Sequence, residues 1–385
     1  MTLTGFPASE YEGRVRAFQS RMRSDEIAAA LITGDANFNY LSGYHHFAPN
    51  TTYCRPVLML VPATDDPVLL VHNALLADAT SDCWFDDVRE YHSMTFAPID
   101  EIVNICRERR VLGQTIGLES GQEHRLGLTL EETDVLRESL RPSRFVDIGA
   151  TLWELRLVKS DAEVAHHREA ARIATEAFSA CFARLRAGMT EIDASALLSA
   201  SIGEQGGRVG FFIITSGEGS YDRGAGLPRD RELRSGDFVW IDVGVVYRGY
   251  WSDHCRAGVI GHASAEQRDM WNAVCQLTGD AVRYVRPGLT ASKLADFIRR
   301  EGGALDVDFS FAAGRSGHGM GLMSTEPPHI AHYDERELRT GMVFTLEPGW
   351  FDQRLGCFVS EENLVLRDDG AELLTQTSRE LLDLA

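Results

Sequence analysis

The sequence predicts an α+β protein in which a smaller α/β domain, residues 1–155, precedes a larger domain, residues 156–385, that is built from an internal duplication. Two observations predict this fold class. In the first part of the chain, short apolar runs alternate with helical patterns, as they do in small α/β domains. In the second part, two sequence motifs occur twice in the same order, which indicates a repeated structural unit.

The first domain is predicted from its apolar patterns. A charged helix is expected over residues 10–25, and helical spacing predicts two more helices at 99–110 and 130–139. Four short apolar runs fit buried strands, at residues 27–32, 57–61, 68–71 and 116–118. This alternation predicts a mixed sheet.

A polar and aromatic loop is expected between the first two strands, at residues 37–56, NFNYLSGYHHFAPNTTYCRP. It holds two adjacent histidines, His45 and His46. A structural role is the expectation for both imidazoles, although loops of this length often reach into a functional site.

The domain boundary is placed near residue 155, where residues 153–159 connect the two domains. A capping box at residues 160–163 then opens a long helix. Similar helix starts occur at 190–193 and 264–267.

The duplication is visible in two motifs. DRELRSG at residues 230–236 returns as ERELRTG at 335–341, and LRAGMT at 185–190 returns as VRPGLT at 285–290. The second motif precedes an amphipathic helical segment in each copy. Each half is therefore expected to run helix, turn, helix and hairpin.

The first hairpin carries two acids. Its arms, residues 239–246 and 250–257, are rich in β-branched and aromatic residues and flank a short turn at 247–249. Folding about this turn makes Asp242 and Asp253 directly opposed partners on one face. Two such carboxylates repel each other unless a cation lies between them, or unless they form a solvated pair at a sheet edge.

The second copy supplies two more acids and a histidine. At the offset of the duplication Asp242 aligns with Glu347, and the return arm at 357–366 carries Glu361 where the first arm carries Asp253. His318 lies in the segment GRSGHGMGL, whose glycines allow a close approach of the backbone to a ligand. A lone histidine in such a turn is more often a loop residue without a functional role. His318 becomes a candidate ligand because it precedes Glu347 and Glu361 and completes a set with the four acids.

The donor set favours two divalent metal ions. Four carboxylates carry four negative charges, which two divalent cations balance. Oxygen ligands with one imidazole nitrogen suit Mn²⁺, Co²⁺, Zn²⁺ or Fe²⁺ better than soft Cu(I), with Mn²⁺ the first expectation. Mg²⁺ usually retains more water ligands.

This set of residues resembles that of the pita-bread metallopeptidases, the family of Xaa-Pro aminopeptidase, prolidase, methionine aminopeptidase and creatinase. The resemblance covers nearly the whole chain. YLSGY at 40–44 and the region of Lys159 are similar to a creatinase/prolidase N-terminal domain, and residues from 160 onward are similar to the catalytic half. The resemblance implies a pita-bread catalytic domain with a pseudo-twofold duplication, preceded by a creatinase-type domain.

The resemblance also implies a role for each residue. Asp242 would chelate the first metal, and His318 and Glu347 would bind the second. Asp253 and Glu361 would bridge both. The implied reaction is hydrolysis of a C–N peptide bond by a hydroxide held between the metals, with His318 and Glu347 as the catalytic residues and Glu347 passing the proton to the leaving nitrogen.

Three positions depart from the family pattern. Ala225 and Thr325 stand where these peptidases usually have histidines that contact the substrate, and Val359 stands where an arginine is common. Four nearby side chains are candidate substitutes, although a surface position is the expectation for each: His329, His332, Arg223 and Arg354.

Three functions follow. The first is an Xaa-Pro peptidase or dipeptidase with altered substrate contacts. The second is an enzyme of the same fold acting on a small non-peptide, as creatinase-like hydrolases and lyases of dimethylsulfoniopropionate do, which the missing histidines favour; the lyases have an aspartate where this chain has Gly244. The third is a non-catalytic binding module, which is expected to have lost ligands, whereas all five are present.

Composition bounds the partners. The 385 residues carry a formal net charge of −19, which disfavours nucleic acid and anionic membranes as partners. The sequence shows neither a secretory signal nor a long apolar run, so a cytoplasmic protein is expected. Seven scattered cysteines without CxxC spacing indicate neither a disulfide framework nor a zinc ribbon. The resemblance implies a homodimer acting on a small peptide or small molecule.

Overall fold

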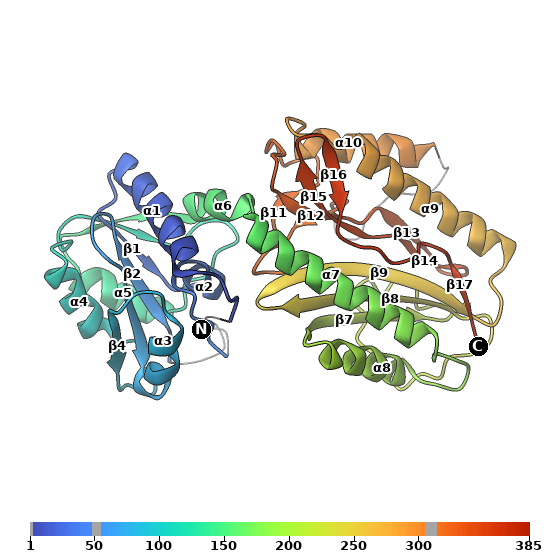
Figure 1. The fold of residues 1–385 in the computed structure, drawn as a ribbon, viewed down its shortest axis with the longest axis horizontal. Helices are drawn as coiled ribbons and strands as arrows, with labels where there is room; N and C mark the ends of the chain where they lie inside the picture. The colour runs from blue at the N-terminus through green and yellow to red at the C-terminus, as the bar shows by residue number, and fades with distance from the viewer. Residues whose placement is uncertain (1–2, 48–54, 305–313) are drawn as a thin grey trace. The chain divides into compact units, whose positions relative to one another are not determined.

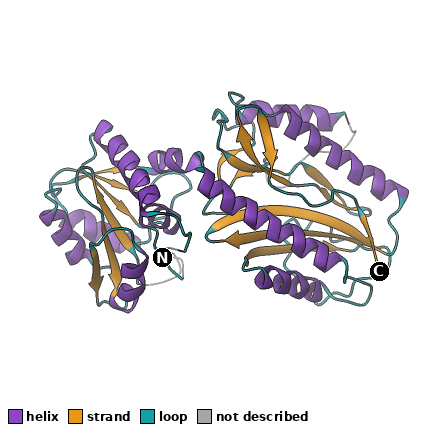
Figure 2. Ribbon diagram, in the orientation of Figure 1, coloured by secondary structure: helices purple, strands orange, loops and turns teal. Residues whose placement is uncertain are grey.

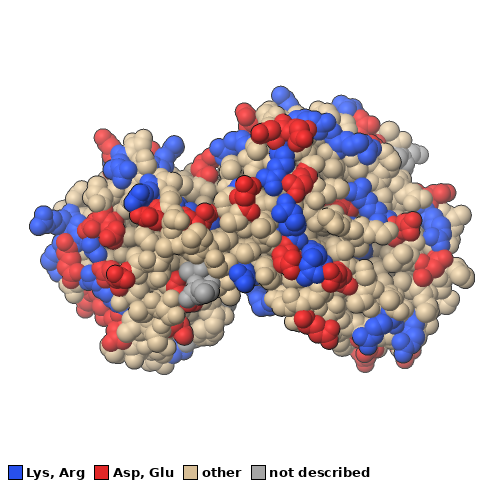
Figure 3. Space-filling view, viewed as in Figure 1, with Lys and Arg blue, Asp and Glu red and all other residues tan. Residues whose placement is uncertain are grey.

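The computed structural model describes residues 3–47, 55–304 and 314–385 (Figure 1). The chain divides into two compact units, Met1–Arg156 and Leu157–Ala385. Figure 2 shows that both units mix helices with strands. On the face drawn in Figure 3, basic and acidic side chains are interspersed over both units.

The first unit is built on a mixed sheet. Its described residues form six strands in the order β4-β3-β2-β1-β5-β6. Strand β1 pairs antiparallel with β2 and parallel with β5, so the sheet is mixed as predicted. The strands are β1 (Ala29–Ile32), β2 (Leu58–Pro62), β3 (Val68–His72), β4 (Val88–Tyr91), β5 (Thr115–Leu118) and β6 (Arg144–Asp147). The helices are α1 (Ala8–Ser24), α2 (Asp35–Ser42), η2 (Asn73–Leu75), α3 (Leu76–Asp82), α4 (Ile99–Glu108), α5 (Leu130–Ser139) and α6 (Gly149–Leu157).

One prediction for this unit was wrong. The expected loop at 37–56 begins inside helix α2, because Phe38 and Leu41 are buried on one face and Gly43 ends the helix in the left-handed conformation, with φ 81°. Residues 48–54 of that loop lie outside the described residues. The predicted connection at 153–159 contains the end of helix α6 and the division between the two compact units, after Arg156. Helix α3 and strands β4 and β6 were not predicted.

The second unit places strands between pairs of helices. In Figure 1, α9 and α10 lie above the strands, α8 lies below them, and α7 runs along β9. The helices are α7 (Asp161–Phe182), α8 (Glu191–Glu204), α9 (Ala265–Tyr284) and α10 (Ala291–Gly303). The strands are β7 (Arg208–Ser216), β8 (Phe238–Tyr247), β9 (Tyr250–Ile260), β10 (His318–Gly319), β11 (Glu326–His329), β12 (Val343–Leu346), β13 (Gly349–Asp352), β14 (Gly356–Val359), β15 (Glu362–Arg367), β16 (Gly370–Leu373) and β17 (Leu382–Leu384). The predicted capping boxes open α7, α8 and α9.

The duplication is repeated in backbone contacts. The amide of Gly188 donates to Leu233 O and that of Gly288 donates to Leu338 O, each at 2.9 Å. Both glycines have positive φ, 83° and 87°, a conformation that other residues rarely adopt. The same turn therefore closes against the same motif in both halves, as the repeated sequence predicts.

The first hairpin forms with a register different from the prediction. Tyr247 pairs with Tyr250 around the two-residue turn Arg248-Gly249, whose φ angles are 49° and 89°. Positive φ at both positions is the geometry of a type I′ turn, which matches the twist of the strands. Asp242 consequently pairs with Cys255 instead of Asp253. Because the register differs by two residues, Asp242 and Asp253 are diagonal neighbours that still share one face.

The second hairpin is interrupted at its acids. Its predicted return arm at 357–366 consists of two strands, β14 and β15, which pair with β13 and β12 respectively. Glu347 and Glu361 occupy the gap between the two pairings, in one continuous register. Pro348 has no amide hydrogen to donate to a ladder, and the amide of Glu347 donates to Ser316 O at 3.0 Å instead. Both glutamates therefore lie outside the regular strand pairing.

Candidate metal centre

Both halves of the second unit contribute to one cluster of side chains. Asp242 lies in β8 and Asp253 in β9, while His318 begins β10. Glu347 follows β12 and Glu361 precedes β15. Asp253, His318 and Glu361 are buried, whereas Asp242 and Glu347 are partly exposed. Solvent therefore reaches the cluster on the side of Asp242 and Glu347.

The five predicted side chains lie in one cluster. One ligand atom from each of Asp253, His318 and Glu361 lies within 4.8 Å of the other two. His318 Nε2 is 3.6 Å from Asp253 Oδ2 and 3.6 Å from Glu347 Oε1. Asp242 and Asp253 are within hydrogen-bond contact. The structure thus brings together all five residues proposed from the sequence.

Glycines allow His318 to reach this cluster. A Cβ atom at Gly317 would lie 2.1 Å from Thr345 O, and one at Gly319 would lie 2.2 Å from Pro327 O. Only glycine avoids these clashes, so the segment must pass this close to the neighbouring backbone. The Nδ1 atom of His318 is 3.0 Å from Gly319 O and donates to it, which leaves the Nε2 lone pair facing the acids.

Without a cation the cluster retains protons. Burial raises the pKa of Asp242 to about 7 and that of Glu347 to about 8. Burial, followed by repulsion from neighbouring acids, also raises the pKa of Asp253 and Glu361. Burial lowers the pKa of His318 to about 3, so the imidazole is neutral. Four acids that resist ionisation beside a neutral imidazole form a set that a positive ion would stabilise.

The donor atoms fit divalent metal ions. Asp242 Oδ1 and Asp253 Oδ1 are buried and have no hydrogen-bond partner within the described part of the chain. Buried carboxylate oxygens without a partner are costly, and a bound cation would compensate both. The available atoms are carboxylate oxygens and one imidazole nitrogen, which are the ligands of Mn²⁺, Co²⁺, Fe²⁺ and Zn²⁺.

Comparison with known proteins agrees with this chemistry. A model of metallopeptidase family M24 matches residues 165–368, and a model of the creatinase/prolidase N-terminal domain matches residues 14–158. The chain belongs to metallopeptidase family M24. It is therefore a metallohydrolase, with a creatinase-type domain before a pita-bread catalytic domain.

Several dipeptidases and prolidases are similar to this chain in sequence or in fold. It is 31% identical over 292 residues to an Xaa-Pro dipeptidase of Pyrococcus furiosus, which covers 74% of this chain and 80% of the relative. A solved prolidase from Pyrococcus horikoshii matches with a TM-score of 0.83 and 26% identity, over 96% of this chain and 100% of that one. A prolidase from Thermococcus sibiricus matches in fold with a TM-score of 0.87 and 24% identity, over 97% and 99% of the two chains.

Hydrogen bonds that the sequence did not predict hold the M24 cluster in place. Asn363 joins the two halves, because its Oδ1 accepts from the amide of Asp253 at 3.0 Å and its Nδ2 donates to Asp253 O. The hydroxyl of Thr345 donates to Glu361 Oε1 at 2.8 Å. These two side chains fix the acids that the resemblance assigns to bridging positions.

The positions that depart from the family pattern lie in different surroundings. Ala225 is exposed, and Val359 packs in the core beside Trp350 and Phe358. Thr325 is half-buried, and its hydroxyl accepts from Arg315 Nη2 at 3.4 Å. A polar contact therefore exists at the position where the pattern expects a histidine.

The four candidate replacements for the missing substrate contacts also differ in their exposure to solvent. His329 is buried, so the prediction of a surface position for it was wrong; strand β11 pairs it with His318. His332 and Arg354 are exposed, and Arg223 is partly exposed. His45 and His46 belong to the first unit.

Sequence reasoning missed Arg315. Its Nε atom lies 3.9 Å from Glu347 Oε1, and its Nη1 donates to His329 Nδ1 at 3.2 Å. The sequence feature that could have indicated it is a basic residue three positions before His318, in the same glycine-rich segment. Its partners, however, depend on the β10–β11 pairing.

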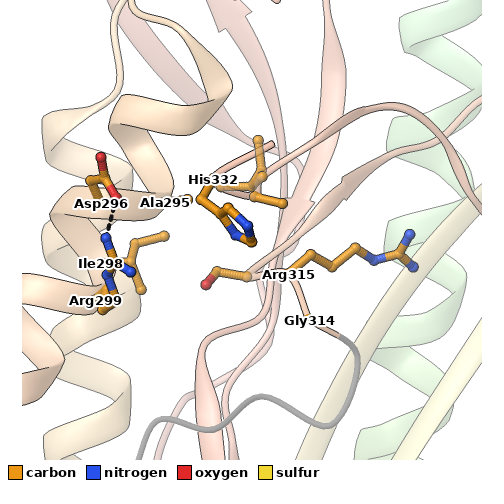
Figure 4. Close-up of a pocket in the computed structure, with 10 residues that line it drawn as sticks. Ala295, Asp296, Ile298, Arg299, Gly314, Arg315 and His332 are labelled. Carbon is orange, nitrogen blue, oxygen red and sulfur yellow. Dashed lines mark hydrogen bonds and ion pairs between the residues drawn. The ribbon is translucent and has the colours of Figure 1, made fainter. Parts of the chain in front are cut away.

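A separate cavity lies on the other side of this segment. It has a volume of about 230 Å³ and is lined by residues of α10 and of the segments 314–316 and 330–332 (Figure 4). Figure 4 shows the guanidinium of Arg315 pointing away from α10 and from Asp296 and Arg299. None of the four acids and the one imidazole of the cluster lines this cavity. Among the described helices, none combines the length and hydropathy needed to cross a bilayer.

Proposed function

We propose that this protein is an Xaa-Pro dipeptidase-type hydrolase that uses two divalent metal ions, with Mn²⁺ the first candidate. The observation that carries the proposal is the contact of four carboxyl groups and one imidazole in a single partly buried cluster, with two buried oxygens left unpaired among the described residues. The names of the relatives support the peptide bond as the target.

Each side chain has a proposed role. Asp242 would hold one metal, His318 and Glu347 the other, and Asp253 and Glu361 would be shared between them. When bound, such cations supply Lewis-acid chemistry, which lowers the pKa of a water nucleophile and polarises the amide carbonyl. All five ligands belong to the second of the two proposed domains, residues 1–155 and 156–385.

Glu347 is the proposed proton carrier. It follows β12 at a break in the sheet. Its carboxyl group lies 3.6 Å from His318 Nε2 and is partly exposed to solvent. A carboxyl group at this place can take the proton of the attacking water and pass it to the leaving nitrogen. Thr345, Asn363 and the flanking glycines keep the other ligands fixed while this happens.

A second function is favoured by one observation. The histidines expected to contact a peptide are replaced by an exposed Ala225 and by Thr325, which is occupied with Arg315. A creatinase-like hydrolase or lyase acting on a small non-peptide substrate therefore remains the alternative. The homodimer and the cytoplasmic location stay predictions from the sequence.

One experiment separates the two functions. The protein is dialysed against chelator, reloaded with Mn²⁺, Co²⁺, Zn²⁺ or Fe²⁺, and assayed by metal analysis and by a substrate screen. The screen contains Xaa-Pro dipeptides and small N-substituted amino acids. Release of proline in proportion to bound metal is the expected result. A loaded protein that ignores every peptide would end the dipeptidase proposal.

A further inference from the structure

A buried ion pair lies in the second unit, apart from the candidate metal ligands. Lys159, two residues before helix α7, has its Nζ atom 3.7 Å from Oε2 of Glu326 at the start of β11, and each side chain is 1% exposed. Figure 1 shows β11 beside the start of α7. Removing two charges from water costs free energy that their attraction does not always recover. What the pair holds in place therefore matters more than the stability it adds.

Glu326 closes the loop that leads away from His318. Residues 320–325 form this loop between β10 and β11. Glu326 Oε1 accepts from the amide of Met323 at 3.1 Å, and a Cβ atom at Gly321 would lie 2.6 Å from Glu326 Oε2. A larger residue at position 321 would displace the carboxylate. The conformation of the loop thus depends on a charged group that solvent barely reaches.

The same loop is bonded to strand β9 near a proposed metal ligand. The amide of Trp251 donates to Gly321 O at 3.1 Å, and its indole Nε1 donates to Leu322 O at 3.2 Å. Trp251 lies two residues before Asp253 in β9. The loop therefore connects β10, which begins at His318, to the strand that carries Asp253.

The start of helix α7 holds both the loop and β9. His167 is buried, and its Nδ1 atom donates to Trp251 O at 2.6 Å. Burial, followed by repulsion from Lys159, lowers the pKa of His167 to about 3, so the imidazole is neutral and carries its one proton on Nδ1. Lys159 is fixed through its backbone, because its amide donates to Gly341 O at 2.9 Å. Lys159 thus contacts the loop from the same end of the helix from which His167 contacts β9.

We infer that the buried Lys159–Glu326 pair is a positioning device for the metal centre, because it fixes the loop 320–325 against β9 and so fixes His318 relative to Asp253. Neither member of the pair belongs to the five proposed ligands. The effect on metal binding rests on the proposed function, whereas the effect on the loop does not. Without the lysine, a buried carboxylate that has lost this cation favours a conformation in which water reaches it.

Metal binding and hydrogen exchange test this role separately. Lys159→Met keeps the length of the side chain and removes its charge, and Glu326→Gln keeps an acceptor for the Met323 amide without the charge. A double variant combines the two changes, and Lys159→Arg keeps the charge. Lys293→Met, at an exposed lysine near the start of α10, is the matched control. Thermal unfolding shows which variants fold, and the double variant replaces Lys159→Met if that one does not, because it removes both charges.

Weaker metal binding with a changed ligand geometry is the expected result. In Lys159→Met the affinity for Co²⁺ falls about tenfold, and the visible absorption spectrum of the Co²⁺-loaded protein changes. Because the two charges act as a unit, the double variant loses no more affinity than Lys159→Met, and Lys159→Arg retains most of it. Lower thermal stability in Lys159→Met with the affinity and spectrum of the wild type would overturn the inference, because the pair would then only stabilise the fold.

Hydrogen exchange separates the positioning role from the proposed function. It is measured on the metal-free protein, in peptides that cover residues 319–326 and, for comparison, helix α8. Faster exchange at 319–326 alone, in Lys159→Met but not in Lys293→Met, is the expected result. A wild-type protein that binds no metal defeats the proposed metal centre, and the exchange measurement then decides the positioning of the loop by itself. Unchanged exchange at 319–326 in Lys159→Met defeats the positioning role, whether or not metal binds.

Discussion

The carboxyl group of Asp253 contacts Asp242 on one side and lies 3.6 Å from His318 Nε2 on the other. It also lies within 4.8 Å of a Glu361 oxygen. Asp253 therefore touches groups assigned to both proposed metals. Its Oδ1 atom has no hydrogen-bond partner within the described residues, so no group in that part of the chain competes with a cation for it.

Asp253→Asn is expected to remove both metals together. The amide keeps the size of the side chain but offers a neutral oxygen, so metal affinity should fall by more than the roughly 10- to 100-fold that is typical of a residue that only orients a ligand. Metal analysis after dialysis measures the stoichiometry. Asp368→Asn, at an acid paired with Thr340 on the surface, is the control. A variant that still binds one metal per chain would contradict the bridging role.

For single residues, the sequence predicted the five clustered side chains but not their neighbours. These five could be proposed as ligands because the duplicated motifs align Asp242 with Glu347 and because glycines mark His318. Arg315 could not be found in the same way. Its contacts with Thr325 and His329 exist because β11 folds back onto β10, and no local pattern reports that pairing.

Side-chain contacts connect the two strands that flank the cluster, β9 and β15. Strands β9 and β15 belong to different sheets, yet the Asn363 side chain makes two hydrogen bonds to the backbone of Asp253. A short distance along the same strands, Arg256 Nη2 pairs with Glu362 Oε1 at 2.9 Å, with side-chain exposures of 3% and 1%. These contacts fix how the two hairpins are aligned.

Asn363→Leu is expected to weaken metal binding without removing a ligand. The apolar side chain has a similar size but leaves the amide and carbonyl of Asp253 unpaired, so metal affinity should fall roughly 10- to 100-fold. Titration of Mn²⁺ into chelator-treated protein measures the affinity. Asn104→Leu, on the surface of α4, should leave it unchanged. Wild-type affinity in Asn363→Leu would show that Asp253 is held by other contacts.

Arg256→Gln is expected to destabilise the second unit. Glu362 would keep Arg379 as a partner, at 2.7 Å, but Glu361 O would lose the hydrogen bond that Arg256 Nη1 donates at 2.9 Å. Breaking a buried ion pair costs about 3 kcal/mol in the free energy of unfolding, which urea denaturation measures.

The exposed pair between Arg354 and Glu266 provides the comparison for this prediction. Its side chains are 68% and 59% exposed. Arg354→Gln should change the free energy of unfolding by less than about 0.5 kcal/mol. Similar losses in Arg256→Gln and Arg354→Gln would show that burial of the Arg256 pair has no special importance.

The strands also show how far local rules extend. The content of β-branched and aromatic residues located both arms of the first hairpin, but their register depends on Arg248 adopting a left-handed conformation that arginine rarely takes. The break in the second hairpin follows from Pro348, which was visible in the sequence, but its effect depends on Ser316 accepting the amide of Glu347. Register and interruption are thus set by contacts between segments.

For the whole molecule, stability and metal binding are linked through the acids. The metal-free protein holds Asp242 with a pKa of about 7 and Glu347 with a pKa of about 8, chiefly because both are buried. In the unfolded chain, exposed carboxyl groups have pKa values of about 4. Folding therefore takes up protons near neutral pH.

The chelator-treated protein is expected to lose stability as pH rises from 6.5 to 8.5. In this window the folded protein releases protons from Asp242 and Glu347, while the unfolded chain has already released them, so the free energy of unfolding falls. Urea denaturation at several pH values measures the slope. Asp242→Asn should show a shallower slope, and added Mn²⁺ should remove it. A metal-free protein whose stability is constant over this range would contradict the raised pKa values.

The repeated turns and hairpins place two of the acids in each half of the second unit. A half-length ancestor with a single hairpin would have carried only one pair of carboxylates. It could have enclosed a cation pair only by associating with a second copy of itself. Fusion into one chain would have made that association permanent, and it would have let one half carry His318 and Arg315 without a match in the other half.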